Sequence, residues 1–176
     1  EHPKVLSYLD VLRDKKPVGE RVAIIGAGGV GFDTAAYLSQ PLHEETLDTF
    51  YAEWGIDYSL TQRGGLTRSQ PPQSARRIWL LQRKAGKPGA TLAKTTGWIH
   101  RTTLQARGVQ LWGGIEYLLI DDKGLHIRRE GDILVLPVDN VIICVGQEPQ
   151  RELAAALRES GKTVRLIGGA DVALEL

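Results

Sequence analysis

A cluster of glycines near the start of the chain is the sequence feature with the clearest chemistry. Residues 26–31 read Gly-Ala-Gly-Gly-Val-Gly, a GxGxxG pattern that directly follows an apolar run and directly precedes a helical pattern. In a nucleotide-binding βαβ unit, the first glycine permits the tight turn, the second lets the backbone approach a pyrophosphate, and the third lets the helix pack on the strand. The helix then directs its first N–H groups and its positive dipole end at the anion. The alternative is a tight turn that binds no ligand. The residues predicted to meet a pyrophosphate are Gly26, Gly28, Gly29, Val30 and Gly31.

The type of dinucleotide depends on the residues at the end of the second strand. Sites for NAD carry an acidic residue about 20 positions past the glycines, which accepts hydrogen bonds from the adenine ribose. Counting leads to Glu53, but this residue lies inside a helical pattern and not at the end of a strand. The second strand is expected at 78–82, and Arg83 and Lys84 come directly after it. Two cations fit the 2′-phosphate that only NADP carries, so NADPH is the predicted cofactor. A solvated basic strand end is the alternative.

Other candidate residues carry weaker signals. Gly146 follows the fourth predicted strand, where a backbone would pass close to the dinucleotide, although a plain strand-to-loop glycine is the alternative. Asp33 is interpreted as a favourable acid near the start of a helix and not as a cofactor ligand. Lys94 precedes two threonines, as at the end of a phosphate-binding P-loop, but Pro88 stands where that motif requires glycine. An NTPase is therefore rejected.

No catalytic pair is evident in the sequence. It offers no general acid/base pair and no nucleophile elbow, which fits a domain that holds a hydride donor for another domain to use. The four histidines, at 2, 43, 100 and 126, have no metal-ligand spacing. Cys144 is the single cysteine, so this chain alone would hold neither a disulfide framework nor an iron–sulfur cluster. A reducing cytoplasm is the simplest expected location.

Composition limits the possible partners. A chain of 176 residues with 42% hydrophobic and 24% charged residues is typical of one globular domain, or of one domain with a small appendage. Because 22 basic residues oppose 21 acidic ones, the net charge of +1 gives no strong attraction to nucleic acids or anionic membranes. No run approaches the ~20 apolar residues that span a bilayer, so a soluble protein is expected. The chain begins with Glu1 and contains no Met, and we interpret it as a piece of a larger protein.

The order of the segments predicts a three-layer α/β Rossmann-like domain, with a parallel sheet and an antiparallel β-meander covering one face. Short apolar runs predict the buried parallel strands, and Asp/Gly turns separate the three strands of the meander. In domain terms, residues 1–20 form a lead-in helix, 21–163 an NADPH-binding domain, and 164–176 the start of a returning FAD-domain segment. A first short helix is expected to have a Ser7 cap, with Val5, Leu9 and Leu12 at helical spacing. Strands are expected at 22–25, 78–81, 109–112, 141–143 and 164–167, and the meander at 115–120, 125–129 and 133–138. Further helices are expected from 32 to 39, 95 to 106 and 151 to 160, with a helical insertion at 41–75 that has helical spacing over 47–54.

Taken together, these segments resemble the NADPH-binding domain of bacterial 2,4-dienoyl-CoA reductases. These are multi-domain flavoproteins of the old yellow enzyme and trimethylamine dehydrogenase group. The resemblance covers nearly the whole chain and rests on HPKVLSYLDVL, VAIIGAGGVGFDTAAYLSQP, LQRKAGKPG, KTTGWIHRTTL, VDNVIICVGQEP and LIGGADVALEL, in that order.

The resemblance implies a route for electrons. NADPH would reduce FAD, a 4Fe-4S cluster would pass electrons to FMN, and FMN would reduce a 2,4-dienoyl-CoA in unsaturated fatty-acid β-oxidation. By the same resemblance, Arg83 and Lys84 would meet the 2′-phosphate, and Gly169 and Asp171 match a motif that binds FAD. The chain ends five residues after Asp171, so a complete FAD site is not expected here.

The partners implied by the resemblance are NADPH and the flavin and iron–sulfur domains of the full-length chain. The barrel for FMN, the cluster cysteines and the catalytic acid are absent from this sequence, so the chain alone should not reduce dienoyl-CoA. Two alternatives stay open. One is a non-catalytic adenine-nucleotide module similar to that of trimethylamine dehydrogenase, and the other is an NADPH-dependent ene-reductase with a different substrate.

Overall fold

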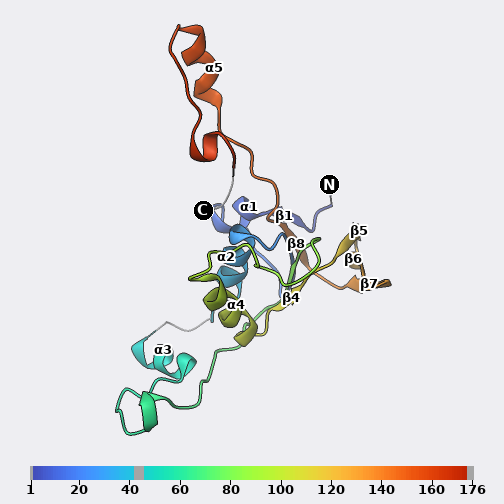
Figure 1. Cartoon of the computed structure of the whole chain (residues 1–176). Helices are drawn as coiled ribbons and strands as arrows, with labels where there is room; N and C mark the ends of the chain where they lie inside the picture. The colour runs from blue at the N-terminus through green and yellow to red at the C-terminus, as the bar shows by residue number, and fades with distance from the viewer. Residues whose placement is uncertain (1, 42–45, 174–176) are drawn as a thin grey trace. The chain divides into compact units, whose positions relative to one another are not determined.

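The structure is a computed structural model that describes the chain apart from residues 1, 42–45 and 174–176 (Figure 1). Its described residues group into two compact units, which divide between Cys144 and Val145. Each unit is described by itself.

The first unit is built on a five-stranded sheet whose strands all run parallel, in the order β1-β8-β2-β3-β4. Its central strand β2 is almost entirely buried, as expected for an apolar run covered on both faces. The strands predicted from apolar runs at 22–25, 78–81, 109–112 and 141–143 are confirmed. The strands are β1 (Val5–Ser7), β2 (Arg21–Ile25), β3 (Arg77–Leu81), β4 (Gln110–Trp112) and β8 (Asn140–Ile143).

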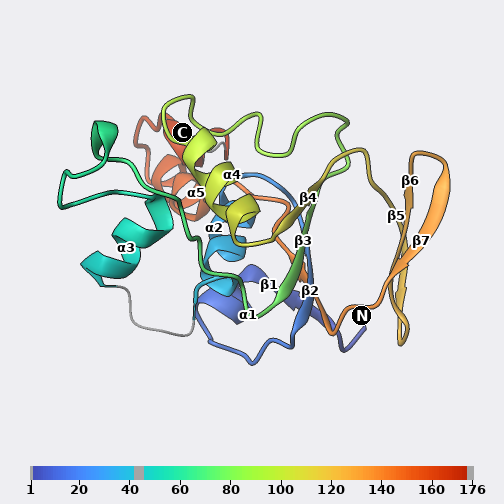
Figure 2. The same cartoon turned by 90° about the horizontal axis from the view of Figure 1, so that it is seen from below.

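Helices cover one face of this sheet (Figure 2). They are α1 (Tyr8–Leu12), α2 (Gly29–Leu38) and α4 (Gly97–Ala106). Phe32 of α2 and Leu104 of α4 are each 1% exposed and pack in the same core as the strand residues on this side. This core fixes α2 directly over the strand that precedes it.

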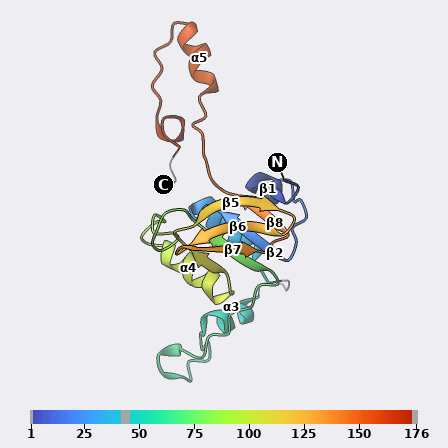
Figure 3. The ribbon, with the colours of Figure 1, turned by 90° about the vertical axis from the view of Figure 1, so that its right-hand side faces the viewer.

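The meander covers the other face (Figure 3). It consists of β5 (Glu116–Asp121), β6 (Gly124–Arg129) and β7 (Asp132–Leu136), which pair antiparallel in that order. Ile127 of β6 is fully buried and belongs to a second core with Trp79 of β3. Helices, parallel sheet and meander therefore make three layers, and the Rossmann-like fold class is confirmed.

The predicted insertion is also present between α2 and β3. It contains α3 (Leu47–Trp54) and a 3-10 turn (Arg63–Gly65), and an isolated bridge joins Ile56 to Leu66. Thr46 caps α3, because its hydroxyl accepts a hydrogen bond from the Thr49 N–H at 3.3 Å. Residues 42–45 of the expected insertion lie outside the described residues.

The lead-in differs from the expected single helix. Ser7 caps a helix as predicted, and Asp10 completes the reciprocal capping box. Val5, however, was wrongly assigned to that helix, because it lies in β1 and pairs with Val141 of β8. As an edge strand, this short segment forms backbone hydrogen bonds with β8, a partner that the helical spacing of its apolar residues does not reveal.

The second unit contains α5 (Glu152–Glu159) and a 3-10 turn (Gly168–Ala170). The helix from about 151 to 160 is confirmed, but the strand predicted at 164–167 is wrong. Val164 and Leu166 instead line, with Leu153 and Leu157 of α5, a cavity of about 330 Å³. A strand needs a neighbour for its backbone groups, and the described residues of this unit supply none. The domain limits at 20, 163 and 164 stay predictions.

Candidate functional site

The glycine turn joins β2 to α2 in the way that the GxGxxG pattern predicts. Gly26 has a φ of +110°, a conformation that favours glycine, and its N–H donates to the carbonyl oxygen of Leu81 at 2.9 Å. Gly28 is the extended N-cap of α2, and its carbonyl accepts the N–H of Phe32 at 3.0 Å. The chain therefore leaves the sheet and enters the helix within three residues.

Gly31 has no room for a side chain. A Cβ atom at Gly31 would lie 1.8 Å from the carbonyl oxygen of Gly26, a backbone atom that cannot move aside without opening the turn. This agrees with the predicted role of the third glycine in helix–strand packing. The positive end of the α2 dipole is thereby held at the carboxyl end of the sheet, where it favours an anion.

Arg83 and Lys84 lie at the same edge of the sheet. β2 and β3 pair in register from Arg21 and Arg77 up to Ile25 and Leu81, and the Gly26–Leu81 hydrogen bond continues that pairing. The two basic residues follow within three positions of Leu81 and are both exposed. Within the described residues, no carboxylate forms an ion pair with either side chain. The two cations and the glycine turn thus follow neighbouring strands at the same edge of the sheet.

The loop that carries Lys84 is held by the chain after β4. The Gly114 N–H donates to the Lys84 carbonyl oxygen at 3.0 Å, and the Gln82 side-chain amide donates to the same oxygen at 2.9 Å. A Cβ atom at Gly113 would lie 2.2 Å from the carbonyl oxygen of Gly86. The sequence interpretation missed this support, although two consecutive glycines directly after a strand are a signal of close backbone approach.

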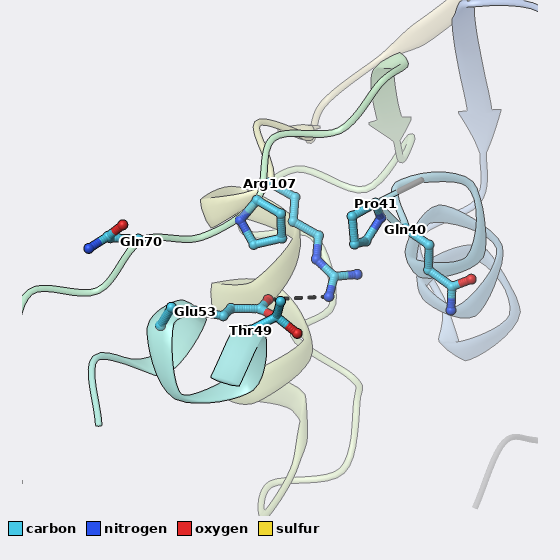
Figure 4. A pocket seen from close by; sticks show the side chains of 8 residues that line it. Gln40, Pro41, Thr49, Glu53, Gln70 and Arg107 are labelled. Atoms are coloured by element: carbon cyan, nitrogen blue, oxygen red, sulfur yellow. Dashed lines mark hydrogen bonds and ion pairs between the residues drawn. The ribbon is translucent and has the colours of Figure 1, made fainter. Parts of the chain in front are cut away.

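Glu53, the acid at the NAD-type spacing, lies elsewhere in the first unit. It belongs to α3, and its carboxylate pairs with the guanidinium of Arg107 at 3.2 Å. Both side chains line a cavity of about 390 Å³ near Gln40, just beyond the carboxyl end of α2 (Figure 4). The glycine turn is at the amino end of that helix, and ten helical residues span about 15 Å. The interpretation that Glu53 is not a ribose ligand is consistent with this position.

The other predicted ligands belong to the second unit. Gly146 has a φ of +83°, Gly169 lies in the 3-10 turn, and the Asp171 N–H donates to the Gly168 carbonyl at 3.0 Å. Their relation to the glycine turn, and the roles of Gly146, Gly169 and Asp171 in binding dinucleotide or FAD, stay predictions.

Cys144 directly follows β8 and lies beside Thr34 in the second turn of α2. Its N–H donates to the Ile25 carbonyl at 2.8 Å, and its thiol lies 3.6 Å from the Thr34 hydroxyl. Burial raises the pKa of the Cys144 thiol to about 11. The thiol is therefore neutral at physiological pH and acts as a small apolar group in the core around α2.

This raised pKa gives a testable pH dependence. Alkylation of Cys144 by iodoacetamide in the folded protein should be slow at pH 8 and should accelerate about tenfold per pH unit up to about pH 11, because only the thiolate reacts. In denaturant the same cysteine should level off near pH 8.5 to 9. The folded pKa exceeds the unfolded one, so the stability that the neutral thiol contributes should be present below about pH 9 and lost between about 9 and 11. Mass spectrometry of quenched samples gives the rates, and a half-maximal rate near pH 8.5 in the folded protein would contradict the assignment.

The described residues contain neither a candidate metal cluster nor a candidate membrane span. No three His, Cys, Asp or Glu residues among them lie close enough to hold a metal ion together. None of the helices in this part of the chain has the length and apolar character needed to cross a bilayer.

By sequence, the chain is similar to parts of longer curated proteins. It is 28% identical over 172 residues to a metal reductase of Desulforamulus reducens, covering 97% of this chain and 25% of the relative. It is 27% identical over 168 residues to a cinnamate reductase of Clostridium sporogenes, covering 96% of this chain and 21% of the relative. The chain thus spans a quarter or less of the length of these curated relatives. No family model matches.

Solved structures show the same fold at low sequence identity. A 2-naphthoyl-CoA reductase aligns with 88% of this chain and 18% of its own, with a TM-score of 0.61 and 17% identity. The flavoprotein disulfide reductase RclA of Escherichia coli aligns with 93% of this chain and 29% of its own, with a TM-score of 0.50 and 15% identity. The fold is therefore one that occurs as part of longer oxidoreductase chains.

Proposed function

We propose that this chain is the NADPH-binding domain of a multi-domain flavoprotein reductase, in which it presents hydride to FAD. The observation that carries the proposal is the pair of exposed cations, Arg83 and Lys84, which follow β3 at the sheet edge where the glycine turn follows β2. Two sequence relatives, named a metal reductase and a cinnamate reductase, support the same class of enzyme.

Each part of the site has one task in this proposal. The turn from Gly26 to Gly31 receives the pyrophosphate. Its glycines let the backbone approach the phosphates closely, and the positive end of the α2 dipole favours an anion there. Arg83 and Lys84 bind the 2′-phosphate through charge-assisted hydrogen bonds. NADPH, once bound, supplies the hydride. The residues of this chain hold and orient the cofactor and do not themselves take part in proton or bond transfer.

The whole protein extends the proposal further by resemblance. FAD would accept the hydride with the help of Gly169 and Asp171, and a 4Fe-4S cluster and FMN in other domains would carry electrons to a 2,4-dienoyl-CoA in the cytoplasm. A second candidate is an NADPH-dependent ene-reductase with another substrate, which the 27% identity to a cinnamate reductase favours. Substrate contacts would lie outside this chain in both cases.

The test is a comparison of affinities. Calorimetric titration should show NADPH binding more tightly than NADH by about tenfold to several hundredfold, and the double variant Arg83→Ala/Lys84→Ala should lose most of that preference while NADH binding changes little. The matched control is Arg63→Ala/Lys123→Ala, which removes the same charge from two exposed positions away from the sheet edge. Equal affinities of the unmodified protein for NADPH and NADH would refute the cofactor assignment. Binding of ADP as tight as that of NADPH would favour the non-catalytic adenine-nucleotide module instead.

A further inference from the structure

The start of the meander runs directly beside the residues that follow β3. The Ile115 N–H donates to the Gln82 carbonyl at 3.0 Å, and the Gly114 N–H donates to the Lys84 carbonyl at 3.0 Å. β5 begins one residue later. The amino end of β5, and with it the carboxyl end of the antiparallel β6, is therefore adjacent to the loop that carries the two cations (Figure 2).

Arg129 is the last residue of β6 and lies at that end. Its guanidinium stacks over the ring of Trp112 at 4.5 Å, and Trp112 pairs in register with Leu81, the last residue of β3. The guanidinium is held against the indole on one face, and the side chain as a whole is 31% exposed. A planar guanidinium fixed in this way is pre-organised for bidentate binding of an oxyanion.

The polar partners of Arg129 are few. Its Nε is buried and has no hydrogen-bond partner among the described residues, and its only ion pair there is with Glu130 at 3.5 Å. The Glu130 side chain is 82% exposed, and such a long, solvated contact is weak. Most N–H donors of the Arg129 guanidinium are therefore not used in contacts with other described residues.

Arg83 lies near the same end of the meander. Burial raises the pKa of the Tyr117 hydroxyl to about 12, and the positive charge of Arg83 acts in the opposite direction. Arg83 also directly follows Gln82, whose carbonyl accepts the Ile115 N–H beside the start of β5. Tyr117 pairs with Ile127 on the inner face of the meander, and Arg129 follows two residues later on the same face of β6. Arg83 and Arg129 thus belong to different layers, and both lie at the end of the meander where β5 begins.

We propose that Arg129 forms a second wall of the 2′-phosphate subsite, so that the phosphate is bound between the loop after β3 and the end of the meander. The proposal rests on the proposed function and extends it. A phosphate monoester carries three terminal oxygens and close to two negative charges, and Arg83 with Lys84 approach it from one strand end only. Arg129 supplies a rigid fork from the neighbouring layer. In this arrangement the meander recognises the cofactor as well as covering the sheet.

The experiment uses two probes that lack the nicotinamide half, 2′,5′-ADP and 5′-AMP, so that it reads only the adenosine end. Arg129→Gln should weaken binding of 2′,5′-ADP about tenfold and leave binding of 5′-AMP unchanged, because only the first probe carries the 2′-phosphate. Arg129→Lys, which keeps the charge but not the fork, should fall between Arg129→Gln and the unmodified protein. Arg128→Gln is the matched control, because Arg128 is the preceding residue of β6 and pairs with Glu116 across β5. Its affinity for both probes should match that of the unmodified protein.

The outcomes separate this inference from the proposed function. If the unmodified protein prefers 2′,5′-ADP and loses the preference on Arg83→Ala/Lys84→Ala but keeps it on Arg129→Gln, the role of Arg129 is refuted and the NADPH assignment stands. If the unmodified protein binds both probes equally, both are refuted. A loss of 5′-AMP binding by Arg129→Gln, with a lowered melting temperature, would show that Arg129 only holds the meander in place and would also refute the inference.

Discussion

Replacing Gly31 with alanine should destabilise the first unit by about 3 to 5 kcal/mol and abolish dinucleotide binding. The added Cβ would meet the Gly26 carbonyl oxygen at 1.8 Å, and relief requires either opening the turn or lifting α2 from the sheet. Phe32, the next residue, is 1% exposed in the core beneath this helix, so lifting α2 would also expose apolar surface. Urea denaturation gives the free energy of unfolding, and titration with NADPH gives the affinity.

Gly108→Ala is the matched control for this prediction. Gly108 also lies in the first unit, with a φ of +84°, but the nearest atom to an added Cβ would be the end of the flexible Gln73 side chain at 3.3 Å. This variant should cost only the strain of a left-handed alanine, about 1 to 2 kcal/mol, and should leave NADPH binding intact. Equal destabilisation by the two substitutions would mean that the clash at Gly31 is relieved by small shifts and that the turn is not as tight as the geometry indicates.

The layered core could be predicted from sequence because its signals are local. β2 is an unbroken apolar run that ends in glycines, and the strands of the meander are separated by Asp-Asp-Lys-Gly and Glu-Gly-Asp turns. Such signals fix the type of each element without reference to distant residues. Since parallel strands end at one edge of a sheet, the same reasoning also predicted that Arg83 and Lys84 follow β3 at the edge where the glycine turn follows β2. Their role in binding a cofactor stays a prediction.

The errors arose where a segment's structure depends on its neighbours. Val5 shows helical spacing in the sequence, but it lies in a strand because β8, more than 130 residues later, offers it a parallel edge. Val164 and Leu166 alternate like a strand, but they pack against α5 because the second unit contains no described strand to pair with. Periodicity reports which side chains are buried and not which surface buries them.

The same limit applies to the candidate site. Arg129 gave no signal in the sequence, since an arginine at the end of a strand before a Glu-Gly-Asp turn is ordinary. Its role in the proposal depends on its stacking with Trp112 and on the position of the loop after β3. These features involve β6, β4 and the loop after β3, which are far apart in the sequence. Only the folded arrangement places them together.

Replacing Arg107 with alanine should have the second largest effect on stability. Its side chain and that of Glu53 are only 12% and 11% exposed, so removing the guanidinium would leave a carboxylate that is largely buried and without its partner. The expected cost is about 3 kcal/mol, toward the lower end for a buried pair because each group keeps some contact with water. Loss of this pair should loosen the insertion, so trypsin should cut the exposed Arg63 and Arg68 faster than in the unmodified protein.

The double variant Glu53→Leu/Arg107→Met provides the control, because replacing both charges with apolar groups of similar volume removes the unpaired carboxylate. It should recover most of the lost stability and the resistance to trypsin. A double variant as unstable as Arg107→Ala would show that packing of the arginine stem, and not the charge pair, holds α3.

Neither variant should change the preference for NADPH over NADH, because this pair lies at the far end of α2 from the glycine turn. If Glu53→Leu/Arg107→Met instead weakened NADH selectively, the acid at the NAD-type spacing would contact the ribose after all, and the assignment of specificity to Arg83 and Lys84 would be wrong.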